Sequence, residues 1–166
     1  MTAAAQARRL HSALLARGET LATAESLTGG ALGVALTAVP GASLTYRGGV
    51  TAYASDLKAR LLGVDADLLA EVGAVHPEVA RAMAAGVRDQ LGSTYGLSTT
   101  GVAGPDPQDG QPPGVVHVGL AGPELSYVTS LQLTGNRATV RNAAVLLALE
   151  LAVDHLAATA DGEAVQ

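Results

Sequence analysis

The sequence predicts an α/β sandwich built on a mixed sheet, and two observations lead to that prediction. Segments with helical periodicity alternate with short β-prone runs, and two late β-prone runs are separated only by a Gly-Pro turn. The alternation is typical of helices packed on a sheet, and the turn indicates an antiparallel hairpin. With 166 residues and no internal repeat or linker, we expect one domain over residues 1–166, with a core at about 8–158 and a polar tail at 159–166.

The first half of the chain is expected to begin with a helix over Ala3 to Arg17, because its apolar positions share one face and Gly18 follows as a stop. A short β-prone run, Thr20 to Ala24, comes next and leads into a polar, glycine-rich junction. The remaining expected elements of this half are a helix over Ala31 to Ala38, a strand over Tyr46 to Tyr53, and a helix over Asp56 to Leu62 capped by Ser55.

The second half contains the clearest helical pattern, because apolar residues recur at every fourth position after His76-Pro77. Proline suits the first turn of a helix, and Gly92 closes this one. The recurring residues are Val79, Met83, Val87 and Leu91. The later elements are expected to be strands over Tyr95 to Thr100, Val115 to Leu120 and Leu125 to Leu133, with a turn at Gly122-Pro123, and a helix over Asn136 to about Leu156.

The composition excludes several classes of protein. Hydrophobic residues make up 48% of the chain and charged residues 15%, which argues against disorder. The absence of cysteine excludes disulfides, thiolate metal sites and cysteine-dependent amidases, and the net charge of −5 disfavours a nucleic-acid surface. Met1 to Arg17 lacks the apolar core of a signal peptide, and Ala143 to Val153 is too short to span a bilayer. We therefore expect a cytoplasmic globular domain without direct nucleic-acid or membrane contacts.

The junction Glu25-Ser26-Leu27-Thr28-Gly29-Gly30 places Ser26 directly after a strand and before a helix. A hydroxyl at such a junction can point to a ligand above the sheet edge, and the unpaired N–H groups of the helix attract a phosphate or an oxyanion. The two glycines would let the backbone approach closely. An ordinary helix cap by Ser26 or Thr28 explains the same residues equally well, and the pattern is neither a G-x-S-x-G elbow nor a Walker loop.

Lys58 is the one lysine among ten basic residues, and the other nine are arginine. Lysine differs from arginine chiefly in that it can lose its proton when desolvated, and a neutral lysine can serve as the base for a serine that cleaves an amide. Tyr53, at the end of the preceding strand, is a candidate neighbour in the same site. A solvated helix residue is the simpler interpretation of Lys58, and Tyr53 is equally consistent with a core position.

The segment from Ser98 to Gly114 carries four prolines and four glycines and follows a strand. A loop of this length inside a small domain is usually functional or mobile. Ligands of open α/β sheets collect at the carboxyl ends of strands, where both Ser26 and Thr100 are expected. This coincidence favours a pocket between them, and the alternative is a surface loop stiffened by proline.

Arg137 and Arg141 lie four residues apart and therefore on one face of the last helix. Cations near a helix N-terminus oppose the macrodipole, so an anion is expected to neutralise them. A phosphate group and a neighbouring carboxylate are equally suitable. The four histidines are scattered without paired-ligand spacing, and we predict no metal site; His117 is expected to be a structural residue within a strand.

Taken together, the motifs resemble one known family in their order along the chain. They read ATAESLTGG, PGAS, YRGGVTAY, LKARLLGV, GAVHPEVARAMA, TTGVAGP, PPGVVHVGLA and GNRATVR, and they cover roughly Leu21 to Leu149. This combination is similar to the CinA C-terminal domain family and is far more specific than any fragment alone. In this sequence we expect no counterpart of the N-terminal molybdopterin-binding-like domain of longer CinA proteins.

The resemblance implies a three-layer α/β/α sandwich and a nicotinamide-nucleotide amidase, which converts nicotinamide mononucleotide to nicotinate mononucleotide and ammonia in pyridine-nucleotide recycling. It implies Ser26 as the nucleophile, with Lys58 and Tyr53 as its activating neighbours. It also implies that the substrate is bound by the residues of three segments, namely Thr28, Gly29 and Gly30; Thr100, Gly101 and Gly104; and Arg137 with Arg141. No metal or organic cofactor is implied, and a homo-oligomer, with a dimer favoured, is expected.

Two residues depart from the family pattern. Leu27 stands where the family usually has cysteine, and we expect its bulk to narrow the pocket. His76 stands where the family commonly has serine, so we expect a lost helix cap that Pro77 offsets. Two other functions are consistent with the sequence. One is a non-catalytic nucleotide-binding or protein-interaction module linked to competence or DNA repair, and the other is a hydrolase of a different nucleotide.

Overall fold

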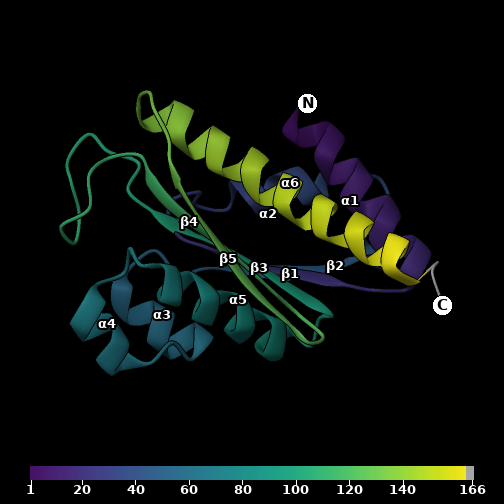
Figure 1. Ribbon diagram of the computed structural model, residues 1–166, viewed down its shortest axis with the longest axis horizontal. Coiled ribbons are helices and arrows are strands. Elements are labelled where there is room, and N and C mark those ends of the chain that lie inside the picture. Colours follow the sequence, from purple (N-terminus) through teal and green to yellow (C-terminus); the bar gives the residue numbers. More distant parts are fainter. Residues whose placement is uncertain (164–166) are drawn as a thin grey trace.

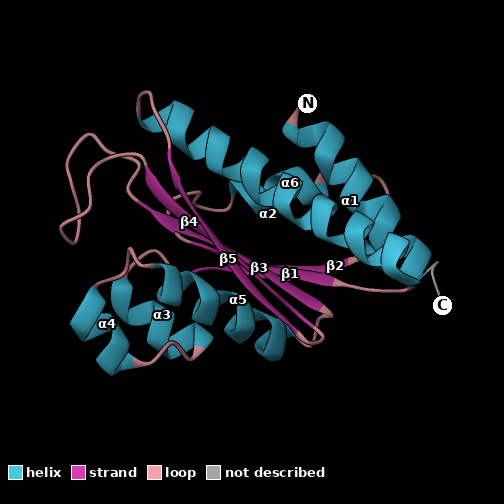
Figure 2. Cartoon of the chain, in the orientation of Figure 1, coloured by secondary structure: helices cyan, strands magenta, loops and turns pink. Residues whose placement is uncertain are grey.

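A computed structural model describes the backbone of residues 1–163 and the side chains of residues 1–158. A five-stranded sheet lies between two layers of helices, which confirms the predicted α/β sandwich (Figure 1). One layer contains α1 (Ala3–Arg17), α2 (Ala31–Thr37) and α6 (Arg137–Glu163). The other contains α3 (Ser55–Leu62), α4 (Ala66–Val72) and α5 (Pro77–Leu91), on the opposite face of the sheet (Figure 2).

The sheet is mixed, as predicted, and its order is β2-β1-β3-β4-β5. Its strands are β1 (Leu21–Glu25), β2 (Tyr46–Thr51), β3 (Tyr95–Gly101), β4 (Val115–Gly122) and β5 (Leu125–Gln132). The first three run parallel, and β4 and β5 form the antiparallel hairpin. Because β1 and β3 are parallel neighbours, their carboxyl ends meet at one edge of the sheet, with Glu25 opposite Thr99.

The core is aliphatic, as the lack of Phe and Trp requires, and the sheet divides it into two clusters. Leu10, Leu97 and Leu149 belong to the cluster beneath α1, α2 and α6. Val79 and Met83 belong to the smaller cluster beneath α3 and α5. The fourth-residue apolar pattern of α5 therefore does face the sheet.

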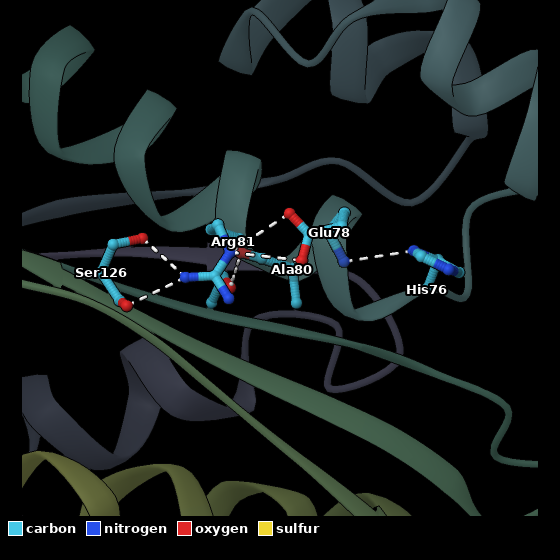
Figure 3. A network of polar contacts seen from close by, with 6 residues as sticks. His76, Glu78, Ala80, Arg81 and Ser126 are labelled. Carbon is cyan, nitrogen blue, oxygen red and sulfur yellow. Dashed lines mark hydrogen bonds and ion pairs between the residues drawn. The ribbon is translucent and has the colours of Figure 1, made fainter.

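His76 caps helix α5 with its own side chain, so the expected loss of a cap is wrong. Its Nδ1 accepts the N–H of Glu78 at 3.2 Å, as Figure 3 shows. One turn further on, Arg81 donates to the carbonyl and the hydroxyl of Ser126, both at 2.9 Å (Figure 3). Helix α5 is thereby tied to the hairpin as well as buried against the sheet. His117 bonds to the Ser130 hydroxyl at 2.8 Å within the hairpin, which fits the structural role predicted for it.

Two further local predictions were wrong, and one helix was not predicted. Ser55 is the first residue of α3, and Ala54 precedes it as an N-cap without a side-chain hydrogen bond. Helix α4 was not expected; it is seven residues long and begins behind Asp65, whose side chain accepts the Asp67 N–H. Helix α6 continues to Glu163 instead of ending near Leu156. Of the predicted polar tail, residues 164–166 lie outside the described part of the chain. Among the described residues, no helix combines the length and apolar character that crossing a membrane requires.

Gly86 makes possible the close packing of α5 against the end of α3, the helix that carries Lys58. A Cβ at this position would collide with the backbone carbonyl of Leu62. We predict that Gly86→Ala lowers the free energy of unfolding by about 1–3 kcal/mol, although alanine favours helices over glycine by about 1 kcal/mol. Urea unfolding measures the change, with Gln90→Ala on the exposed side of the same helix as control. A Gly86→Ala protein as stable as wild type would contradict this packing.

Candidate active site

Ser26 occupies the first position beyond β1, at the edge of the sheet where β1 and β3 end together. Its N–H extends the ladder by donating to the Thr99 carbonyl at 3.0 Å, and its own carbonyl accepts the Gly29 N–H at 3.0 Å. Gly29 and Gly30 adopt left-handed φ angles of 62° and 95°, which side chains disfavour. The glycines thus allow a tight turn that holds the Ser26 side chain at the carboxyl edge of the strands.

Lys58 reaches the same point from α3. Its Nζ donates to Ser26 Oγ at 3.1 Å and to the Ala52 carbonyl at 2.8 Å. The lysine side chain is only 1% exposed, and among the described residues no carboxylate forms an ion pair with it. The structure therefore brings together the serine and the lysine that the sequence singled out.

Burial lowers the pKa of Lys58 from 10.5 to about 8, and the negative charge of Asp109 partly opposes this decrease. At pH 7 roughly one amine in ten is then unprotonated, against roughly one in 3,000 at the ordinary value. The unprotonated amine can accept a proton from the neighbouring hydroxyl. A serine beside such an amine can act as a nucleophile without a histidine.

The N-terminus of α2 is not an open anion site, contrary to the expectation from the sequence. The Glu25 carboxylate accepts the N–H groups of Gly30, Leu32 and Gly33 at 2.8–3.0 Å. The Gly29 N–H is bonded to Ser26, so neither glycine of the junction offers a free donor. Within the described chain, the N–H groups of Leu27 and Thr28 have no hydrogen-bond partner. Any oxyanion donor from this turn must therefore precede Gly29.

A pocket of about 360 Å³ opens in front of Ser26 and Leu27. Its remaining walls are Tyr53, Arg137 and the loop over 101–108, which includes the predicted Gly101 and Gly104. The volume lies within the range of about 300–1,000 Å³ that small-molecule sites have. No group of three His, Asp or Glu side chains in the described part of the chain could hold a metal ion.

Arg137 and Arg141 lie on one face of α6, but they contact different parts of the site. Arg137 lines the pocket and donates to the Gly104 carbonyl at 2.7 Å and to the Tyr53 hydroxyl at 2.9 Å. Arg141 donates to the Leu27 and Thr28 carbonyls at 2.9 and 3.2 Å and so holds the turn that carries the serine. In the described chain neither arginine forms an ion pair with a carboxylate, and Arg137 shares the pocket wall with Asp106.

Other predicted site residues take supporting positions. Thr28 and Thr100 are buried outside the pocket wall: the Thr28 hydroxyl bonds to Thr99 at 2.8 Å, and Thr100 donates to the Ala74 carbonyl at 2.8 Å. The Tyr53 ring is 59% exposed, and its hydroxyl contacts Arg137 instead of the Ser26–Lys58 pair. The Leu27 side chain packs into the core, so only part of it borders the pocket and its bulk is absorbed by the interior.

Sequence reasoning missed three groups of this site. The Ala52 carbonyl is a backbone group, so no residue type could reveal it. Asp109 reaches back from the loop to accept the Ala74 N–H at 2.8 Å, and nothing in its spacing indicates that contact. Glu25 could have been found, because an acidic residue shortly before a helix is a common partner of its first N–H groups.

The fold and the site together define an α/β/α domain with a buried Ser–Lys pair and an arginine-lined pocket at the carboxyl edge of its sheet. The sequence matches the CinA C-terminal domain over residues 3–156, and the chain belongs to that family. A CinA-like protein of Frankia casuarinae is 53% identical over 150 residues, which are 90% of this chain and 35% of the relative. A CinA-like protein of Gloeobacter violaceus is 51% identical over 144 residues, or 84% of this chain and 34% of the relative.

Solved structures agree with this assignment over nearly the whole chain. The CinA superfamily protein of Klebsiella pneumoniae 700603 aligns with a TM-score of 0.91 and 31% identity, covering 95% of this chain and 99% of that one. The competence/damage inducible protein CihA of Agrobacterium tumefaciens aligns with a TM-score of 0.88 and 30% identity, covering 92% and 94%. The chain spans about a third of the length of the two CinA-like relatives above.

The titration of Lys58 can be observed directly, because a chain with one lysine gives one ¹³Cε signal after labelling. We predict that this signal titrates near pH 8 in the folded protein and near 10.5 after unfolding. Since the folded pKa is the lower one, unfolding takes up a proton between these values, and the free energy of unfolding should rise as the pH increases through that window. A folded-state midpoint near 10.5 would contradict a buried, easily deprotonated amine.

Proposed function

We propose that the protein is an amidohydrolase that converts nicotinamide mononucleotide to nicotinate mononucleotide and ammonia. The observation that carries the proposal is the 3.1 Å contact between the Ser26 hydroxyl and the buried Lys58 amine, at the wall of a pocket that also contains Arg137. This pair supplies a nucleophile and its base, and the arginine supplies a partner for a phosphate. Membership of the CinA C-terminal domain family is consistent with the same reaction.

In the proposed reaction the neutral Lys58 amine takes the proton of Ser26 as Oγ attacks the carboxamide carbon. The resulting ammonium returns a proton to the amide nitrogen, and the C–N bond breaks to release ammonia and leave an ester on Ser26. Lys58 then deprotonates a water molecule, which hydrolyses the ester to the carboxylate product. Each proton taken up by the lysine is given back, so the amine is regenerated at the end of the cycle.

The tetrahedral intermediate requires a donor for its oxyanion. The Leu27 N–H is the strongest candidate, because it directly follows the nucleophile, belongs to a pocket-lining residue and has no partner in the described chain. The amide after the nucleophile has the same task in nucleophile elbows. The exposed Tyr53 ring can pack against the cationic pyridinium ring of the substrate, an interaction worth about 0.5–2 kcal/mol.

We predict that Ser26→Ala lowers ammonia release by at least about 10³-fold while leaving the fold intact, because the nucleophilic oxygen is lost. Lys58→Arg should lower it by at least about 10²-fold, since a guanidinium stays protonated. Lys58→Met, which is apolar and of similar length, provides a second test if the larger arginine disturbs packing. Ser55→Ala, on an exposed position of α3, is the matched control. Wild-type rates in either active-site variant would exclude this mechanism.

We predict that Arg137→Gln raises KM for nicotinamide mononucleotide by about 10- to 100-fold, because a charge-assisted contact with the phosphate contributes about 1.5–3 kcal/mol. Arg47→Gln on β2, outside the pocket wall, serves as the control. Nicotinamide riboside lacks the phosphate, so its kcat/KM should be nearly the same for wild type and variant. An equal loss on both substrates would instead mean that Arg137 acts by holding the loop and Tyr53.

A wild-type protein that binds the nucleotide but releases no ammonia would contradict the proposed activity. That result would favour a nucleotide-binding module. Incubation with nicotinamide mononucleotide, an ammonia assay and a calorimetric binding titration distinguish the two outcomes in one preparation.

A further inference from the structure

Glu25 directly precedes the serine and is buried, with 2% of its surface exposed. Its carboxylate accepts three backbone N–H groups at the start of α2, those of Gly30, Leu32 and Gly33. We propose that Glu25 is a positioning residue, which fixes the Ser26–Gly30 turn and thereby keeps the Ser26 hydroxyl against the Lys58 amine. The contacts are independent of any reaction, but their effect on catalysis rests on the function proposed above.

The environment of Glu25 shows what stabilises a carboxylate at this buried position. No lysine, arginine or histidine of the described chain forms an ion pair with it. A buried carboxylate without compensation is strongly unfavourable. Here three charge-assisted hydrogen bonds and the positive end of the helix dipole take the place of a cation. The carboxylate and the turn are therefore mutually dependent: the turn satisfies the charge, and the charge holds the turn closed.

The turn is held from two sides. Glu25 spans it internally, since its side chain connects the last residue of β1 to the first residues of α2. On the other side, Arg141 binds the Leu27 and Thr28 carbonyls from α6. Ser26 lies between these two attachments. Its backbone N–H donates to the Thr99 carbonyl, and its carbonyl accepts the Gly29 N–H. Releasing one attachment should let the serine move relative to Lys58, whose own position is fixed by α3.

Glu25 cannot take part in the reaction itself. It is absent from the wall of the pocket in front of Ser26. It lies instead beside a separate hollow, whose other walls include Gly30, Tyr46 and Thr51. A role as acid or base at the substrate is therefore excluded by its position, and its influence must pass through the turn.

The test is Glu25→Gln. This substitution keeps the shape of the side chain, removes its negative charge, and places an amide N–H donor against the backbone N–H groups of α2. We expect kcat for ammonia release to fall by about 10- to 100-fold with KM within about threefold, because small misplacements of reacting groups have effects of this size. The same loosening should admit water to the Lys58 amine, so its ¹³Cε titration should move upward from about 8. Amide exchange at Gly30, Leu32 and Gly33 should also become faster.

Val34→Gly is the matched control, because Val34 lies in α2, is 68% exposed, and its side chain forms no hydrogen bond with the turn. Its N–H donates to the Gly30 carbonyl at 2.9 Å, and glycine keeps that N–H. Glycine weakens the helix without removing the carboxylate. We expect this variant to keep the wild-type kcat and Lys58 titration. If Glu25→Gln does not fold, Glu25→Asp retains the charge on a shorter side chain and should give a smaller decrease in kcat and a smaller titration shift.

Three results would overturn the proposal. The first is a folded Glu25→Gln or Glu25→Asp protein with wild-type kcat, and the second is such a protein with an unchanged Lys58 titration. The third is a decrease in kcat in Val34→Gly equal to that in Glu25→Gln. Failure of the proposed function is distinguishable from these. If wild-type protein releases no ammonia, the amidase activity is wrong, while the Lys58 signal and the amide exchange rates still test whether Glu25 holds the turn.

Discussion

The burial of one amine beneath one turn is the constraint on which the site depends. Among the described residues, the Ala52 carbonyl and the Ser26 hydroxyl are the acceptors of the hydrogen bonds that the Lys58 amine donates. An ammonium group in that environment is costly, which is why the pKa of Lys58 falls to about 8. The buried position of Lys58 both lowers the pKa of its amine and places that amine beside the Ser26 hydroxyl.

The remaining elements position Ser26 and Lys58, and they leave Arg137 at the pocket wall without an ion pair in the described chain. Parallel pairing of β1 and β3 brings Ser26 to the carboxyl edge of the sheet, where the pocket opens. Glu25 occupies the helix N-terminus that an anion would otherwise use, and Arg141 is engaged by backbone carbonyls. Arg137 is consequently the cation of the pocket wall, and an anionic substrate group is expected to bind there instead of at α2.

Much of the fold could be predicted, because helical periodicity, first-turn proline and terminal glycines act locally. Helix α4 was missed, because seven residues show too little periodicity to indicate a helix by themselves. Helix α2 is equally short, but the glycine-rich junction before it and Pro40-Gly41 after it marked its ends. Within the site, Ser26 was singled out by its position between a predicted strand and a predicted helix, and Lys58 by being the one lysine of the chain. The sequence could not predict that Arg137 lines the pocket while Arg141 binds the turn. Their spacing defines a shared helix face, but it does not show how α6 packs against the turn. Free N–H groups were expected at the start of α2, but the Glu25 carboxylate accepts their hydrogen bonds.

The covalent step is tested most directly by single-turnover kinetics, with protein in excess over nicotinamide mononucleotide and with increasing hydroxylamine. In the proposed mechanism, an ester on Ser26 forms before the added nucleophile acts. The proposed mechanism therefore predicts a constant rate of ammonia release, while the hydroxamate progressively replaces the acid among the products. A rate of ammonia release that rises in proportion to hydroxylamine would mean direct attack on the bound amide and would contradict a serine nucleophile.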